Sequence, residues 1–213
     1  LRKKILFTLL ILLIFRLGNA VPVPFVNVEA LTSYFNSQLS DTILGLYNAM
    51  SGSAFASATV FALSIQPYIN ASIIIQLLTI AIPALERLAK EGGEEGKQKI
   101  ARITRYTTVG LGLLMGFAYY IMLSNAGLLT HTGFIYGLVI VVSFTAGAAF
   151  VMWLGEQVSE FGIGNGISII LFANIISRIP DNIISLVTNL STGAMKWWGA
   201  TIVLVGVAAL VLL

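Results

Sequence analysis

The sequence predicts an all-α membrane protein, because it carries little charge and its apolar residues come in long runs. Of the 213 residues, 57% are hydrophobic and only 10% are charged, whereas a soluble domain typically carries about 25% charged residues. The chain has no cysteine, which excludes a disulfide framework, thiolate catalysis and cysteine-based metal sites. Several apolar runs approach the roughly 20 residues that a helix needs to cross a bilayer.

Basic residues predict the orientation in the membrane. Arg2, Lys3 and Lys4 precede the first apolar run and six more basic residues lie in 86–105, so these two places hold nine of the twelve Lys and Arg residues. Segments rich in Lys and Arg stay on the cytoplasmic side. The basic start followed by the apolar run 5–15 also resembles a signal peptide, but further runs of the same kind favour a spanning helix.

The apolar runs predict five spanning helices and the start of a sixth. The first is ended by two prolines, since proline lacks a backbone donor and its predecessor avoids the helical region. A short outer turn (125–132) separates the third span from the fourth, and a cytoplasmic connection (155–166) leads to the fifth. Trp197 and Trp198 mark a membrane interface at the start of the sixth. The predicted spans are 5–21, 63–85, 107–124, 134–154, 167–179 and an incomplete 197–213.

The second predicted span holds many polar residues for a membrane helix. Between residues 61 and 78 these are Gln66, Pro67, Tyr68, Asn70, Ser72 and Gln76. Polar groups in hydrocarbon are costly unless they face a bundle interior or a water-filled cavity. The proline, with the Ser/Gly-rich residues 51–53 before it, predicts a discontinuous helix that starts part-way through the bilayer. Such a helix indicates a polypeptide or solute path rather than a passive anchor.

Residues 25–60 mix polar side chains with one short apolar stretch at 43–47. A stretch of this length cannot cross a bilayer. We therefore expect an external loop followed by a short helix that re-enters the membrane without crossing it.

Patterns typical of soluble enzymes fail on spacing or setting. Residues 93–97 lack the first glycine and the Ser or Thr of a phosphate loop, and no strand precedes the glycines of 162–166, as a dinucleotide fingerprint requires. His131 is the single histidine, which excludes a histidine metal site, and we interpret it as a solvated loop residue. Glu156 and Glu160 lie one helical turn apart. We expect a solvated helix end without a basic partner, rather than acid–base chemistry.

Read in their setting, several of these segments resemble one known family. Residues 152–173, which contain the string GIGNGI, are similar to a segment of the SecY family, the central subunits of protein-conducting translocons. The broken helix at 61–76, the string 15–18 with the prolines that follow it, and the basic hairpin that starts at Lys90 also resemble that family. The resemblance runs in order over essentially the whole chain. It implies the amino-terminal half of a SecY-type helical bundle with a re-entrant plug helix, whose inverted second half is absent here.

The resemblance also implies roles for individual residues. A ring of aliphatic side chains that closes the pore would contain Ile65, Ile69 and Leu171. The plug would be residues 41–58, including Ile43, Leu44, Tyr47, Met50, Gly52 and Phe55, with small side chains that suit loose packing. Gln76 and Thr79 would be polar residues of a lateral gate, or else ordinary core residues with satisfied hydrogen bonds. The cytoplasmic loop that identifies the family would contain Gly162, Gly164, Asn165 and Gly166.

In function, the resemblance implies a channel that passes unfolded secretory polypeptides and releases transmembrane helices laterally into lipid. It implies a multi-pass protein of the bacterial plasma membrane, rather than of a plastid membrane, that is not an enzyme and needs no cofactor. Partners would be SecE-type and SecG-type small subunits, signal peptides and nascent chains, and the lipid bilayer. A SecA motor or a ribosome would dock mainly on loops of the missing half. We expect no specific nucleic-acid readout.

Two other classes remain as alternatives. Half of an inverted-repeat secondary transporter would also show a broken helix at mid-membrane. It would need an ionisable residue at the break, and only Asp41 lies between Glu29 and Glu86. An intramembrane hydrolase would need a pair of aspartates, a zinc motif or a Ser–His pair within the spans, and the predicted spans contain none of these.

Overall fold

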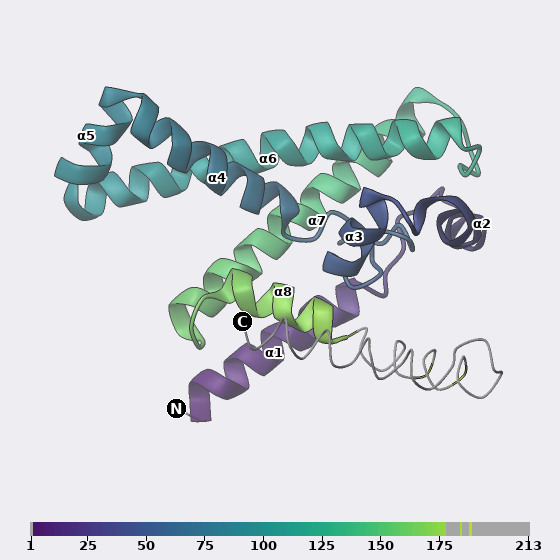
Figure 1. Cartoon of the computed structure of the whole chain (residues 1–213), viewed down its shortest axis with the longest axis horizontal. Coiled ribbons are helices and arrows are strands. Elements are labelled where there is room, and N and C mark those ends of the chain that lie inside the picture. Colours follow the sequence, from purple (N-terminus) through teal and green to yellow (C-terminus); the bar gives the residue numbers. More distant parts are fainter. Residues whose placement is uncertain (1, 178–183, 185–187, 189–213) are drawn as a thin grey trace, which may run out of the picture. The chain divides into compact units, whose positions relative to one another are not determined.

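The computed structural model describes residues 2–177, 184 and 188, and within them the chain is helical, as predicted (Figure 1). The helices in chain order are α1 (Arg2–Gly18), α2 (Val28–Tyr34), a short π-helical turn η1 (Phe35–Leu39), α3 (Ile43–Met50), α4 (Gln66–Ala81), α5 (Pro83–Glu91), α6 (Gly93–Asn125), α7 (Phe134–Phe161) and α8 (Gly166–Ile176). Residues 1–175 form one compact unit and 176–213 form a second. In the second unit, the Thr188 hydroxyl donates to the Ile184 carbonyl one helical turn away. The predicted sixth span lies outside the described residues.

Helix α1 has one buried face and one exposed apolar face. Thr8, Ile11 and Phe15 recur at helical spacing and are buried, and the Phe15 ring stacks on Phe61 with centroids 5.6 Å apart. The opposite face exposes large apolar side chains, which are Leu6, Leu9, Leu10, Leu13 and Leu17. Since the exposed face of α1 is apolar as well as the buried one, it suits contact with lipid.

Helices α6 and α7 are the longest described helices, with 33 and 28 residues, and both are long and apolar enough to cross a membrane. Helix α6 begins well before the predicted span 107–124, and α7 ends well after the predicted span 134–154. Hydropathy marks only the part of a helix that faces hydrocarbon, whereas Glu, Lys, Gln and Arg allow the helix to continue into water. The two helices pack closely where glycines face side chains. An added Cβ at Gly112 would touch Thr145, and one at Gly116 would lie 3.3 Å from the carbonyl oxygen of Val141. Small residues at such crossings allow membrane helices to approach.

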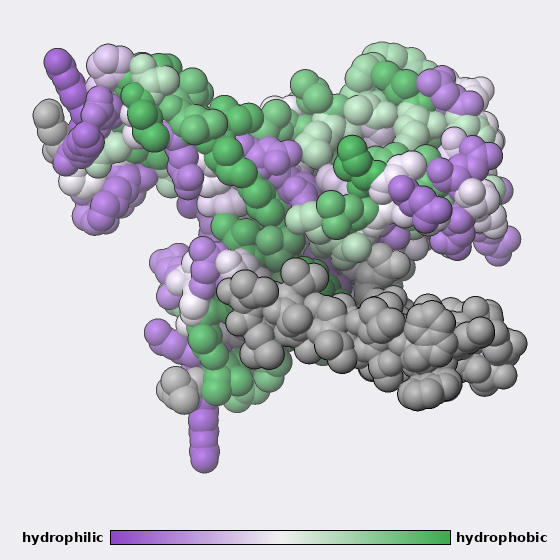
Figure 2. All heavy atoms as spheres, viewed as in Figure 1, coloured by the Kyte–Doolittle hydropathy of each residue, from purple (hydrophilic) through white to green (hydrophobic). Residues whose placement is uncertain are grey.

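Helix α4 begins at Gln66 with Pro67 in its first turn, which confirms the predicted start of a discontinuous helix. The segment predicted as one span over 63–85 is not one continuous helix in the structure. Ile82 is extended (φ −109°, ψ 112°) because it precedes Pro83, and α5 departs from α4 at 102°. Figure 2 shows hydrophilic side chains around α5 and the start of α6, whereas apolar side chains cover α4. Counted as one span, the bent pair would be a third crossing beside α6 and α7.

The segment between α1 and α4 is more ordered than the predicted external loop. Asn27 caps α2 by accepting from the Ala30 amide at 3.1 Å. The extended residues before this cap pair with two distant turns: Val23 N donates to Ala58 O at 2.9 Å, and Asn27 N donates to Leu128 O at 3.0 Å. The chain after α1 is therefore tied both to the residues that lead into α4 and to the turn between α6 and α7.

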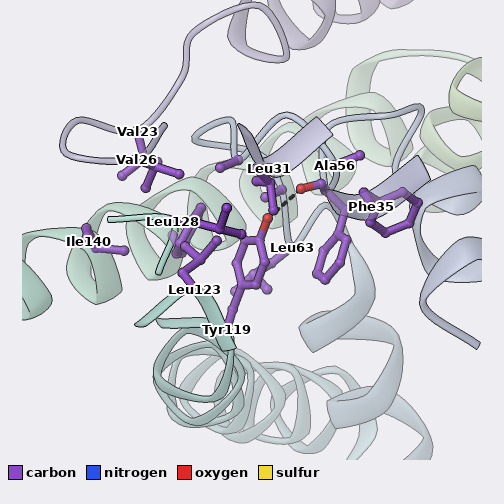
Figure 3. Close-up of a cluster of buried hydrophobic side chains, with 14 of the residues drawn as sticks. Val23, Val26, Leu31, Phe35, Ala56, Leu63, Tyr119, Leu123, Leu128 and Ile140 are labelled. Carbon is purple, nitrogen blue, oxygen red and sulfur yellow. Dashed lines mark hydrogen bonds between the residues drawn. The ribbon is translucent and has the colours of Figure 1, made fainter. Parts of the chain in front are cut away.

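The main hydrophobic core forms around the residues that lead into α4 (Figure 3). Phe55 stacks on Tyr119 of α6 with ring centroids 4.4 Å apart, and the Tyr119 hydroxyl donates to the Phe55 carbonyl. Ala58, Ala62 and Leu63 are also buried. The expectation of loose packing is thus wrong for 51–58, because Phe55 and its neighbours are themselves buried core residues.

Candidate functional site

The three residues predicted for the pore ring lie around one buried cluster. Ile65 precedes α4 and is fully buried, whereas Ile69 on α4 and Leu171 on α8 pack against the cluster while keeping some exposure. The other buried members come from α1, α7, α8 and the approach to α4, and they are Ile11, Phe15, Phe61, Val151, Leu154, Val158 and Ile170. The structure therefore brings all three predicted residues together, and it leaves Ile69 and Leu171 with surface free to face a lumen.

Helix α4 buries one face, and among the described helices it packs mainly on α6. Pro67, Ala71 and Ile75 recur every fourth residue and are buried. The face that continues from Ile69 is exposed: Ile73 is 51% exposed and Ile80 is 78% exposed. Helix α4 is a half-helix, in the sense that it starts beside the cluster instead of continuing from an earlier helix. Its exposed apolar face must therefore contact a further protein partner, line a lumen or face lipid.

The two residues predicted for the lateral gate behave differently. Gln76 is an exposed side chain on the free face of α4, as a gate residue requires. The Thr79 hydroxyl is part-buried and donates to the Ile75 carbonyl of its own helix at 2.7 Å. Thr79 thus has the satisfied hydrogen bond of the alternative interpretation.

The GIGNG turn between α7 and α8 is tightly packed. Gly164 has φ +62°, a left-handed conformation that glycine adopts without strain. A Cβ on Gly166 would collide with the carbonyl oxygen of Gly155, so the start of α8 touches the α7 backbone. The Asn165 side chain caps α8 by accepting from the amides of Ile167 at 3.0 Å and Ser168 at 3.3 Å. These contacts explain why this turn needs small residues and an asparagine in this order.

Two hydroxyls that the sequence did not single out hold this turn. Ser159 Oγ accepts from the Gly166 amide at 2.9 Å, and Thr8 Oγ1 on α1 accepts from the Ile163 amide at 3.3 Å. A Cβ on Gly162 would lie 2.6 Å from Thr8 Oγ1. Thr8 lies 155 residues away in the sequence, so only the fold could reveal its role. A single hydroxyl amid apolar residues of α1 was the available signal.

The predicted plug residues divide into a peripheral helix and a buried turn. On α3, Ile43 is 85% exposed, and Leu44 and Tyr47 line an apolar cavity of about 210 Å³ against α6. The Met50 sulfur accepts from Gln66 Nε2 at 3.3 Å. After α3, Gly52 (φ +65°) turns the chain into the core that contains Phe55. The short helix predicted at 41–58 is therefore helical only over Ile43–Met50.

The expectation that Glu156 has no basic partner is wrong. Arg105 Nε of α6 donates to Glu156 Oε1 of α7 at 2.8 Å, with the two side chains 54% and 24% exposed. The other described ion pairs, Glu86 with Lys90 and Glu94 with Lys97, join neighbouring turns of one helix. Those two pairs depend only on helical spacing, whereas the pair between α6 and α7 depends on how these helices pack.

We expect the Arg105–Glu156 pair to couple the two helices weakly. Arg105→Glu or Glu156→Arg alone should lower the free energy of unfolding, and the double reversal should recover about 0.2–1 kcal/mol, as measured for partly exposed pairs. Unfolding of the four proteins in detergent, at low and high salt, measures this coupling. The same cycle at Glu86 and Lys90 is the control for a pair within one helix. If the changes in unfolding free energy caused by the two single substitutions simply add in the double variant, Arg105 and Glu156 do not interact.

His131 lies on the surface, as expected, with its ring 5.3 Å from Tyr136 and 5.9 Å from Phe25. In the described part of the chain, no three His, Asp or Glu side chains meet as a metal site would require. What the described residues do form is a half-helix that starts beside an apolar cluster, a short peripheral helix, and a closely packed turn between α7 and α8. This geometry suits the passage or sealing of a path, and it offers no nucleophile with a paired base.

Comparison with known proteins agrees with this geometry. The solved structure titled "The structure of a protein conducting channel" superposes on 83% of this chain with a TM-score of 0.59 at 18% identity, and the match covers 36% of that chain. "Sec61 in the Canine ribosome-channel complex from the endoplasmic reticulum" matches with the same values. The class that the fold defines is therefore a multi-span helical membrane protein with the fold of a protein-conducting channel.

The family follows from the sequence comparisons. The SecY family model matches residues 59–213. A protein translocase subunit SecY of Bacillus subtilis (strain 168) is 46% identical over 186 residues, which is 85% of this chain and 42% of the relative. That of Escherichia coli (strain K12) is 40% identical over 215 residues, or 99% and 47%. The chain belongs to the SecY family, and it spans about half the length of these relatives, corresponding to their amino-terminal half.

Proposed function

We propose that this chain forms half of a protein-conducting channel of the bacterial plasma membrane, which passes unfolded secretory polypeptides and releases apolar helices laterally into lipid. The observation that carries the proposal is the half-helix α4, which begins beside a buried apolar cluster and, beyond Ile69, leaves the face with Ile73 and Ile80 uncovered by the described residues. The relatives named above are translocase subunits, which favours a channel over half of a secondary transporter.

Within this proposal, Ile69 and Leu171 form part of an apolar constriction, and Ile65 supports them from the core. Aliphatic side chains at a narrow point exclude water and ions when no polypeptide is present. Gln76, on the same free face of α4, borders the opening to lipid. The turn 162–166 sets the cytoplasmic start of α8 and so the height of Leu171 along the path.

The proposal extends to partners. SecE-type and SecG-type subunits and the second half of the channel would cover the exposed apolar face of α4, since large apolar patches mark interaction or lipid-facing surfaces. A SecA motor or a ribosome would supply the driving force, because the described residues form no site for nucleotide chemistry. Signal peptides would enter along the free face of α4.

The plug in this proposal is α3, whose side chains are more exposed than those of the turn that follows it. Tyr47 donates to the Leu63 carbonyl at 3.3 Å, and Asn48 Oδ1 accepts from the Ala56 amide at 2.9 Å. Ile43 and Leu46 in the first turn of α3 are exposed, so moving this turn would expose little additional apolar surface. We therefore expect motion about Gly52, with the buried residues after it staying in place.

A cleavable crosslink tests whether α3 must move. Leu44 and Met122 line the same cavity, and the chain has no native cysteine, so a cysteine pair at these positions gives a clean background. In the native channel, joining the two thiols with a cleavable reagent should block translocation, and cleavage should restore it. A pair at Leu113 and Leu138, which both line the groove between α6 and α7, is the control and should not block. Undiminished translocation with the first crosslink formed would show that α3 is only a surface helix.

A further inference from the structure

A polar pocket of about 230 Å³ lies where α1 ends, opposite its basic start. It is formed by the last turn of α1 together with the turns after α3, and its lining residues are Arg16, Asn19, Ala20, Gly52, Ser53, Ala54 and Ser57. The lining carries one cation, one amide and two hydroxyls, and no acidic side chain. A polar pocket beside an otherwise apolar helix is a candidate for a polar ligand.

The Asn19 side chain lacks hydrogen-bond partners although it is enclosed. Its Nδ2 and Oδ1 atoms are both buried, and neither has a partner in the described part of the chain. Buried amides are nearly always satisfied, because an unmade hydrogen bond leaves the full cost of desolvation. Because Asn19 also lines the pocket, a turn of its side chain toward an occupant would give this amide the partner that it lacks.

Arg16 gives the pocket its charge. The side chain is exposed, and the three ion pairs among the described residues join Glu86, Glu94 and Glu156 to other cations. A guanidinium matches the oxygens of phosphate and carboxylate groups, and such charge-assisted hydrogen bonds are stronger than neutral ones. Ser53 and Ser57 add half-buried hydroxyls at the rim. Arg16 also lies in the last turn of α1, where the helix dipole by itself favours a cation. The position of this cation therefore does not by itself indicate a ligand, and the test must include Asn19.

We propose that this pocket binds a phosphate-class oxyanion, carried by the headgroup of an anionic phospholipid or free in solution. The exposed face of α1 favours the lipid source. Leu6, Leu10, Leu13 and Leu17 follow one another at helical spacing, are 55–67% exposed, and lead along the helix to the turn that carries Arg16. Acyl chains could lie along this stripe while the phosphate reaches the guanidinium.

The test compares lipid retention by variants of the native protein in nanodiscs made with equal amounts of phosphatidylglycerol and phosphatidylcholine. Native mass spectrometry after release counts the bound lipids. Arg16→Gln should lower the retention of phosphatidylglycerol about tenfold, the loss of one charge-assisted contact. Arg16→Lys should retain most of it. Asn19→Asp keeps the shape of the side chain but adds a negative charge, and it should lower retention as much as Arg16→Gln.

Arg102→Gln is the matched control, because it removes an exposed cation that lies outside the pocket. A second arm titrates inorganic phosphate against the protein in phosphatidylcholine alone and follows the unfolding temperature. Stabilisation there that Arg16→Gln and Asn19→Asp abolish, without selective lipid retention, would assign the oxyanion to solution. Retention and stabilisation that do not change in these two variants, or that Arg102→Gln lowers equally, would overturn the proposal.

Discussion

Replacing Ile69 by aspartate should raise the ion leak of the resting channel severalfold. Ile69 lies in the first turn of α4, packs against the apolar cluster around Ile65, and keeps part of its surface free. An apolar constriction blocks ions because water leaves it, and a carboxylate at that point holds water and cations in place. Conductance across planar bilayers that contain the native complex, without a translocating polypeptide, measures the leak.

Ile74→Asp is the matched control for this prediction. Ile74 is on the same helix and 40% exposed, but it lies off the face of Ile69, since five residues of helix turn it by about 140°. We expect this change to disturb the contact of α4 with its surroundings and to leave the leak near the wild-type value. An unchanged leak in Ile69→Asp protein that still assembles would remove Ile69 from the pore.

Replacing Gly147 by alanine should destabilise the protein by about 3 kcal/mol, at the upper end of the cost of overpacking a core. Gly147 lies on α7, and an added Cβ would collide with the backbone carbonyl oxygen of Val60. That backbone cannot easily move away, because Val60 N donates to Val21 O and Val23 N donates to Ala58 O, both at 2.9 Å. Thermal unfolding in mild detergent measures the loss.

Gly110→Ala provides the control for a glycine in a spanning helix. Gly110 is on α6, and an added Cβ there would meet no atom within 4 Å. Alanine is favoured over glycine in helices by up to about 1 kcal/mol, so this variant should be as stable as the wild type or more so. Equal destabilisation by the two changes would mean that α7 does not approach Val60 as described.

The sequence was sufficient for the features that depend on local chemistry. Pro67 cannot continue a helix from its N-terminal side, so the start of α4 followed from the chain alone. The long apolar runs within α6 and α7 were also readable, because a bilayer demands a minimum length of apolar helix. The GIGNG string and the broken helix carried the resemblance to the SecY family, and the family match confirms it.

Features that depend on the meeting of distant segments could not be read in this way. The small side chains of 51–58 predicted a loosely packed part of the plug, yet Phe55 stacks on Tyr119 and is buried in the core. Glu156 shows no neighbour of opposite charge in its own turn, and its partner Arg105 arrives from another helix. The 102° bend after Ala81 is different, because its cause is local: Pro83 was visible, but the prediction followed the apolar run through it.

Composition and helix punctuation by themselves therefore determined the class of protein, its membrane setting and the position of the discontinuous helix. Each of these follows from energies that act within one turn of helix or between one segment and the bilayer. The tertiary structure alone decided which glycines are close contacts, which hydroxyls hold the GIGNG turn, and which part of 41–58 is buried. Those properties depend on distances between atoms far apart in sequence, such as Thr8 and Ile163 at 3.3 Å, and a chain specifies them only through packing.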